Sequence, residues 1–202
     1  MRLGLFGGSF DPVHYGHLLL AETCREQARL DELWFIPAAA PPHKQHVTLS
    51  PAKDRVEMLR LALAGHPSMT VSTREIDRGG VSYTVETLRT LRSERPGDEL
   101  FWLMGSDTLW DLPKWREPAE ILALATPVVV QRRGSVAPDF SPLAGLVSAE
   151  RLAEFQSYLV EMPVIELSST ELRERAQSQR SLRFRTPRAV ERYIESARLY
   201  TT

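Results

Sequence analysis

The sequence predicts an α/β protein with one doubly wound, mostly parallel sheet. Short apolar runs alternate with helical stretches along the chain, and no internal repeat or low-complexity segment interrupts them. Strands that alternate with helices at this spacing form βαβ units, and these build parallel sheets. A chain of 202 residues is long enough for one well-buried core and short for two, so we expect a single domain over residues 1–202.

The elements follow from the apolar periodicity and from the turn residues between the runs. Strands are predicted at residues 3–6, 33–36, 69–72, 100–104, 128–130 and 164–167. Helices are predicted at residues 16–29, 84–92, 117–125 and 148–159, with Pro127 ending the connection before the fifth strand. Ser50 and Pro51 read as an N-cap and a first helical residue, with the helix running to about Ala64. Residues 134–160 are the least patterned, and residues 168–202 are expected to be mostly helical.

Composition and charge favour a soluble cytoplasmic protein. The net charge is -1, so no global field attracts nucleic acid or an acidic membrane, and neither is an expected partner. The single cysteine, Cys24, can form neither an internal disulfide nor a thiolate metal site. The apolar run near the N-terminus is too brief for a signal peptide, and no run approaches the roughly 18 residues that span a bilayer.

The densest group of polar residues follows the first predicted strand. Gly7 and Gly8 let backbone N–H groups approach a phosphate, because no Cβ is in the way. The helix that follows directs further N–H groups and a partial positive charge to the same place. His14 and His17 are three residues apart at its start, so both rings can donate to charge that develops on a phosphate oxygen. The segment therefore predicts a phosphate site.

Other interpretations of this segment fit less well. Two histidines three apart could bind a metal, but no third ligand of the right kind is evident nearby, and we expect no protein metal site. The sequence contains neither Gly-x-Gly-x-x-Gly nor Gly-Lys-Ser/Thr, the dinucleotide and Walker fingerprints. Ser9 is not expected to be a hydrolase nucleophile, because Asp11 stands where a nucleophile elbow needs glycine.

Further positions have both a ligand-binding and an ordinary structural interpretation. Ser168-Ser169-Thr170 precedes a predicted helix and, with the planar fork of Arg173, can hold a triphosphate; a plain capped helix is the alternative. Lys44, in a loop stiffened by prolines, is a point charge suited to phosphate or a solvated surface lysine. Trp115 could stack on a pyridinium ring or belong to the core.

Two more positions lie at element ends. Asp107 follows a predicted strand and could accept from ribose hydroxyls or cap the next short helix. Thr84 begins a helix, so its N–H is a free donor for an anion.

Residues 7–17 resemble the Gly-Gly-Ser/Thr-Phe-Asp-Pro-x-His-x-Gly-His signature of the nucleotidyltransferase superfamily with the His-x-Gly-His motif. The rest of the chain more narrowly resembles the bacterial nicotinate-nucleotide adenylyltransferases. The matching segments are Pro41-Pro42-His43-Lys44, residues 75–88, Gly105-Ser106-Asp107 with Leu109 and Trp115, residues 167–173, and the pattern from Pro187 to Tyr200. The chain departs from the family at Glu86 (usually Asp), at Arg133 (usually Pro), and over residues 135–160, which do not align.

This resemblance implies a Rossmann-like nucleotidyltransferase fold, present as a monomer or homodimer, that transfers AMP from ATP to nicotinate mononucleotide. The products would be nicotinate adenine dinucleotide and pyrophosphate, with Mg²⁺ carried in on ATP. The implied catalytic residues are His14, His17, Lys44 and Arg173. ATP is expected at Gly7, Gly8, Ser9, Phe10, Arg132, Ser168, Ser169 and Thr170. The mononucleotide is expected at Tyr83, Thr84, Gly105, Asp107, Trp115 and Arg116.

Two alternatives stay open at this point. One is a transferase of the same superfamily with another acceptor, such as phosphopantetheine or nicotinamide mononucleotide. The other is a non-catalytic regulator that binds nucleotides on this fold.

Overall fold

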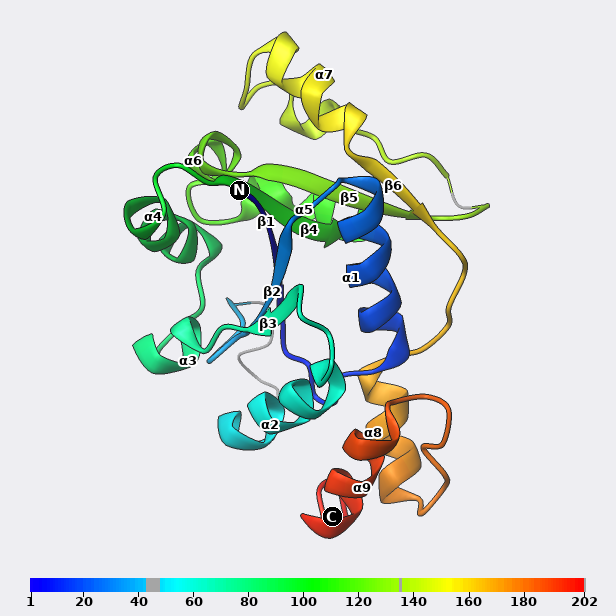
Figure 1. Ribbon diagram of the computed structural model, residues 1–202. Coiled ribbons are helices and arrows are strands. Elements are labelled where there is room, and N and C mark those ends of the chain that lie inside the picture. Colours follow the sequence, from blue (N-terminus) through cyan, green and yellow to red (C-terminus); the bar gives the residue numbers. More distant parts are fainter. Residues whose placement is uncertain (43–47, 135, 202) are drawn as a thin grey trace.

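The computed structural model describes residues 1–42, 48–134 and 136–201, and it contains one six-stranded sheet (Figure 1). The strands are β1 (Arg2–Gly8), β2 (Glu32–Pro37), β3 (Met69–Val71), β4 (Glu99–Gly105), β5 (Thr126–Arg132) and β6 (Leu159–Met162). Their order is β3-β2-β1-β4-β5-β6, and each neighbouring pair is parallel. The predicted doubly wound parallel sheet is confirmed. The connections diverge between β1 and β4, which is where such sheets bind ligands.

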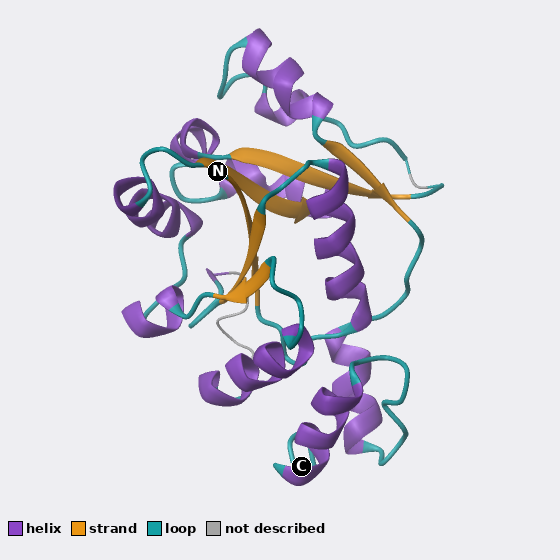
Figure 2. Ribbon diagram, viewed as in Figure 1, coloured by secondary structure: helices purple, strands orange, loops and turns teal. Residues whose placement is uncertain are grey.

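Helices cover both faces of the sheet (Figure 2). They are α1 (Tyr15–Gln27), α2 (Ala52–Leu63), α3 (Arg74–Arg78), α4 (Thr84–Glu94), α5 (Ser106–Asp111), α6 (Pro118–Leu124), α7 (Ala149–Ser157), α8 (Ser169–Gln177) and α9 (Arg188–Ser196), with 3₁₀ turns η2 (Leu112–Lys114) and η3 (Ser141–Leu143). No helix in the described part of the chain is both long enough and apolar enough to cross a membrane.

Most strands supply residues to both hydrophobic cores, one on each face of the sheet, because successive side chains of a strand point to opposite faces. In β5, Val128 and Val130 belong to the core that also contains residues of α1, α2, α8 and α9, whereas Val129 belongs to the core that contains residues of α4, α5, α6 and α7. Strands buried on both faces read as continuous apolar runs. That is why the run at 128–130 could be recognised from sequence.

The last strand was predicted at the wrong residues. Pairing with β5 places β6 at Leu159–Met162, so the predicted helix at 148–159 ends earlier, at Ser157. The run at 164–167 forms no strand; Val164 is 55% exposed, and Ile165 and Leu167 line a cavity described below. This run is apolar because part of it forms a cavity wall, which a periodicity argument cannot separate from a strand.

Other element boundaries also differ from expectation. Helix α2 begins at Ala52, with Pro51 as its N-cap residue, and the N–H of Ser50 instead donates to the Asp11 carboxylate at 3.0 Å. Pro127 lies inside β5 rather than ending the connection before it. Helix α3 was not predicted, and the short helix α5 was raised only as an alternative role for Asp107, since five or six residues are too few to show a 3.6-residue period.

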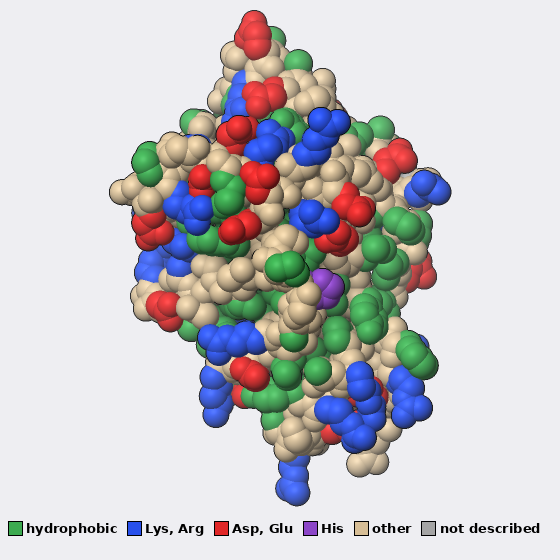
Figure 3. All heavy atoms as spheres, in the orientation of Figure 1, with side chains coloured by type: hydrophobic (Ala, Val, Ile, Leu, Met, Phe, Trp, Pro, Cys, Tyr) green, Lys and Arg blue, Asp and Glu red, His purple; other side chains and the backbone are tan. Residues whose placement is uncertain are grey.

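Surface charge is unevenly distributed over the face shown in Figure 3. Acidic and basic side chains are interspersed over most of it, whereas basic ones gather at its lower end, over α8 and α9. Local charge on this protein therefore matters more than its small net charge.

Candidate active site

Two cavities lie at the carboxyl ends of the strands, on either side of the divergence between β1 and β4. The first has a volume of about 410 Å³ and the second about 640 Å³. Gly8, Ser9 and Gly105 line both. Two ligands, one in each cavity, would therefore approach each other across the segment where β1 ends, residues 7–13, which we call the phosphate loop.

The two glycines of the phosphate loop are required by aromatic packing. A Cβ on Gly7 would lie 2.8 Å from the ring of Trp102, and one on Gly8 would lie 2.9 Å from the ring of Phe10. The sequence predicted that Gly7 contacts ATP together with residues that line the second cavity. In the structure Gly7 lines the first cavity and not the second. The glycine pair thus allows two rings to pack directly against the loop, in addition to any approach of a phosphate.

His14 and His17 form a stacked pair on the wall of the second cavity. Their ring centroids are 3.7 Å apart and the planes differ by 25°. The backbone N–H of His14 donates to Nδ1 of His17 at 3.2 Å. Because Nδ1 is the acceptor in this bond, the neutral tautomer of His17 carries its proton on Nε2, where it can be donated. The pair is arranged as the phosphate-site hypothesis requires.

Burial makes His14 a neutral donor. Its side chain is 5% exposed, and loss of solvation lowers its pKa from 6.5 to about 4. An imidazole with that pKa is uncharged near neutral pH and still offers one N–H.

The low pKa of His14 predicts a loss of stability in acid. The unfolded chain takes up the proton first, so the free energy of unfolding should fall as the pH drops from 6.5 to about 4. At about 1.4 kcal/mol per pH unit, the total is roughly 3 kcal/mol. Denaturant unfolding across this range should show the fall in the wild type and a flatter curve in His14→Gln. The exposed His66 is the control, and His66→Gln should keep the wild-type slope. Equal slopes in all three proteins would contradict the assignment.

The start of α8 forms the opposite wall of the second cavity. Ser168 is its N-cap and its Oγ accepts from the Glu171 N–H at 3.1 Å, as the capped-helix pattern predicts. The hydroxyl of Ser169 donates to the carbonyl of Pro12 at 2.9 Å, which joins the helix to the phosphate loop. The N–H groups of Ser169 and Thr170 take part in none of the hydrogen bonds between described residues. They are the orphan donors that a helix N-terminus offers to an anion.

Arg173 ties this helix to the phosphate loop. Its Nη1 donates to the carbonyl of Asp11 at 2.8 Å, and its Nη2 donates to Oγ1 of Thr170 at 3.1 Å. Its guanidinium also lines the second cavity, where its remaining N–H groups can meet a phosphate. Arg173 therefore has a structural and a ligand-facing side.

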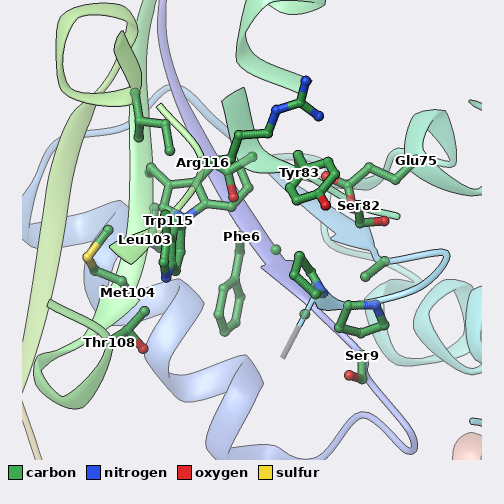
Figure 4. A pocket seen from close by; sticks show the side chains of 18 of the residues that line it. Phe6, Ser9, Glu75, Ser82, Tyr83, Leu103, Met104, Thr108, Trp115 and Arg116 are labelled. Atoms are coloured by element: carbon green, nitrogen blue, oxygen red, sulfur yellow. The ribbon is translucent and has the colours of Figure 1, made fainter. Parts of the chain in front are cut away.

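Four aromatic side chains, those of Phe6, Tyr83, Trp102 and Trp115, line the first cavity together with smaller apolar and polar residues (Figure 4). Trp115 and Tyr83 face it from the two sides, and the guanidinium of Arg116 lies 4.7 Å from the centroid of the Tyr83 ring. Arg116 also pairs with Glu86 at 2.9 Å. A flat ring of about the size of a pyridine would contact aromatic surface here.

Backbone donors are available at the same cavity. Thr84 is the first residue of α4, and its N–H is used in none of the hydrogen bonds between described residues. The N–H of Trp115 donates to the carbonyl of Leu112 at 3.0 Å, so it is already engaged. The next amide in the chain, that of Arg116, has no such bond among the described residues.

The remaining predicted residues fall as follows. Asp107, predicted to contact the mononucleotide, lines the second cavity, together with Arg132, Ser9 and Phe10. Lys44 lies outside the described residues. No group of three or more His, Cys, Asp or Glu side chains suited to a metal ion occurs within the described ranges.

Sequence reasoning missed several residues around the site. Ile165 and Leu167 form an apolar wall of the second cavity. Glu75, which is 4% exposed and accepts from Thr87 Oγ1 at 2.6 Å, lines the first. Arg55 is also buried, on the apolar stripe of α2. A charged residue on such a stripe could have indicated from the sequence that it has buried partners.

Comparison with known proteins first defines the class. A family model described as cytidylyltransferase-like matches residues 5–175. With the parallel sheet and the histidine pair at the phosphate loop, this match defines a nucleotidyltransferase-like α/β protein.

Curated relatives then define the family. A probable nicotinate-nucleotide adenylyltransferase of Thermus thermophilus is 45% identical over 201 residues, covering 99% of this chain and 100% of the relative. One from Thermomicrobium roseum is 41% identical over 201 residues, covering 100% of this chain and 92% of the relative. The chain belongs to the nicotinate-nucleotide adenylyltransferase family, which confirms the resemblance drawn from its motifs.

A solved structure supports the fold. The nicotinic acid mononucleotide adenylyltransferase of Plasmodium falciparum, solved with NaAD, superimposes with a TM-score of 0.74 at 16% identity. The match covers 98% of this chain and 97% of that one.

Proposed function

We propose that this protein transfers AMP from ATP to nicotinate mononucleotide, giving nicotinate adenine dinucleotide and pyrophosphate in NAD biosynthesis. Membership of the family supports the reaction, and one structural observation carries it. The first cavity offers aromatic side chains and, among the described residues, an unbonded N–H at the start of a helix. The second contains the histidine pair and Arg173. The two cavities share Gly8, Ser9 and Gly105 as a common wall. Such a pair of cavities suits two substrates whose phosphates must meet.

The reaction needs no enzyme nucleophile. An oxygen of the mononucleotide phosphate attacks the α-phosphorus of ATP, the new P–O bond forms, and the bond to the bridging oxygen breaks. Pyrophosphate leaves with that electron pair. Catalysis is then alignment plus stabilisation of charge on the α-phosphate and the leaving group. We assign the stacked His14 and His17 to the α-phosphate, and Arg173 with Lys44 to the phosphates.

The two substrates are assigned to the cavities by their chemistry. ATP suits the second cavity, where the N-terminus of α8 and Arg132 can meet a triphosphate and Asp107 can accept from a ribose hydroxyl. The pyridine ring suits the first cavity, against Trp115, with its carboxylate near the Thr84 N–H. This assignment moves Asp107 from the mononucleotide to the ATP side.

We further propose Mg²⁺ as the cation that accompanies ATP. Among the described residues that line the second cavity, Asp107 supplies the one carboxylate. A single carboxylate fits Mg²⁺, which keeps several waters and is held largely by substrate phosphates. When bound, the cation would neutralise charge on the leaving pyrophosphate.

Pyrophosphate release with ATP and one acceptor at a time tests the proposal. Rapid release is expected with nicotinate mononucleotide, and much slower release with nicotinamide mononucleotide or phosphopantetheine. Faster release with either of these would identify a different transferase of the superfamily. ATP binding without release for any acceptor would instead identify a non-catalytic nucleotide-binding protein.

A further inference from the structure

A buried polar cluster lies beneath the phosphate loop and has no part in the assignments above. It joins Arg55 of α2, Asp11 of the loop and Tyr200 near the end of the chain. Arg55 and Asp11 are each 1% exposed. A charge buried to this degree is costly unless its hydrogen bonds are satisfied, so the contacts of the cluster show what it holds in place.

Arg55 holds two backbone carbonyls. Its Nη1 donates to the carbonyl of Ser9 at 3.0 Å, and its Nε donates to the carbonyl of Ser50 at 3.1 Å. Ser9 belongs to the phosphate loop, and Ser50 lies just before α2. A single guanidinium thus fixes the distance between these two chain segments.

Asp11 completes the same connection through its carboxylate. Oδ2 accepts from the Ser50 N–H at 3.0 Å, and Oδ1 accepts from the hydroxyl of Tyr200 at 2.6 Å. Burial, with the charge of Asp11, raises the pKa of the Tyr200 phenol far above its ordinary value. The hydroxyl therefore keeps its proton near neutral pH and remains a donor.

The backbone at both ends of the cluster is strained. Phe10 has a φ of 48° and Tyr200 a φ of 62°, in the left-handed region that residues with a side chain rarely occupy. Such conformations persist where the surrounding contacts over-determine them, and they concentrate at functional sites.

The orientation of one peptide unit links the cluster to catalysis. In a trans peptide the carbonyl and the following N–H point in opposite directions. Since the Ser9 carbonyl is turned inward to Arg55, the N–H of Phe10 is turned the other way, and it is used in no hydrogen bond between described residues. Ser9 and Phe10 both line the second cavity.

We propose that Arg55 and Tyr200 are positioning residues that aim the Phe10 N–H at a phosphate of ATP. Arg55 orients the Ser9–Phe10 peptide by binding its carbonyl. Tyr200 binds the carboxylate of Asp11 and so holds the following part of the loop in place. The C-terminal segment of the chain thereby becomes part of the nucleotide site without touching the nucleotide. The inference rests on the proposed function for its kinetic consequence, whereas its effect on ATP binding requires no acceptor.

Tyr200→Phe tests the proposal, because it removes one hydroxyl and keeps the ring. A matched control is Tyr193→Phe, since the Tyr193 hydroxyl joins the C-terminal segment to α2 by donating to Asp54 Oδ1 at 2.8 Å and makes no hydrogen bond to the phosphate loop among the described residues. Each variant loses one tyrosine–aspartate hydrogen bond, and the melting temperature of each separates any loss of stability from a loss of ATP affinity. In Tyr200→Phe alone, the ATP dissociation constant from calorimetry should rise about 5-fold. Its kcat should fall about 10-fold, with the KM for nicotinate mononucleotide unchanged.

Arg55→Lys provides a second variant, since an ammonium cannot reproduce the fork that spans two carbonyls. We expect a kcat loss of about 10²-fold at an unchanged KM for the mononucleotide. Wild-type ATP affinity and kcat in Tyr200→Phe, or equal losses in Tyr193→Phe, would overturn the positioning role. Absence of turnover in the wild-type protein would contradict the proposed function instead, and the ATP affinities of the two tyrosine variants would still decide the inference.

Discussion

Replacing His17 with alanine should lower kcat about 10²–10³-fold while ATP affinity changes only a few-fold. The ring lies on the wall of the second cavity, stacked at 3.7 Å on His14, with Nδ1 occupied by the His14 N–H. Its proton therefore lies on Nε2, from which it can be donated to charge that grows on the α-phosphate in the transition state. A donor that acts mainly on developing charge contributes to kcat more than to ground-state binding.

The control is His66→Ala, which removes an exposed imidazole far along the chain from the phosphate loop and should be kinetically silent. Steady-state kinetics of pyrophosphate release, with ATP affinity from calorimetry, separates the two effects. A collapse of ATP affinity with kcat preserved would make His17 a binding residue and remove its catalytic role.

The fold was predictable because its strands are buried on both faces. Runs such as 100–104 and 128–130 read as strands whichever helices cover them, and five of the six strands were predicted at nearly the right residues. The exception is β6, a four-residue strand in which Glu161 is exposed between Val160 and Met162. The position of β6 is determined by its pairing with β5, a tertiary contact that the sequence pattern does not show. The strand was therefore predicted at the apolar run of residues 164–167.

The site was predictable where local geometry decides it. Residues three apart at a helix start, such as His14 and His17, must lie together in any fold, and they do. Asp107 lines the second cavity and not the first, where the mononucleotide was expected. The direction in which α5 leaves the sheet decides which cavity the Asp107 side chain lines, and the sequence alone does not give that direction. The contacts of Arg55 and Tyr200 with the loop span 46 and 189 positions of the sequence, and no spacing rule reaches that far.

The second large effect concerns the acid and amide forms of the acceptor. We expect a preference for nicotinate over nicotinamide mononucleotide of roughly 10- to 10³-fold in kcat/KM. The carboxylate has acceptors only, whereas the amide places an NH₂ donor at one of those positions. Two backbone donors at the first cavity have no hydrogen bond among the described residues: the Thr84 N–H at the start of α4, and the Arg116 N–H beside Trp115.

The structure changes one detail of this scheme. The Trp115 N–H is bonded to the Leu112 carbonyl, so the second donor is the amide of the following residue. Two N–H groups facing the amide would leave its NH₂ without an acceptor, at a cost of about 1–3 kcal/mol for each unpaired group. The N-terminal end of α4 adds to the preference, because its partial positive charge favours an anion over a neutral group.

A competing explanation is that the Arg116 guanidinium reads the carboxylate, and a substitution separates the two. In the structure this guanidinium lies over the Tyr83 ring and pairs with Glu86, so its charge is already engaged. Arg116→Gln removes the cation and leaves the backbone donors in place. Specificity constants for both mononucleotides at saturating ATP should therefore give a similar acid-to-amide ratio in the wild type and the variant. A ratio near one in Arg116→Gln alone would assign the discrimination to the side chain. A ratio near one in the wild type, or a preference for the amide, would mean that the Thr84 and Arg116 N–H groups do not face the substrate carboxylate at all.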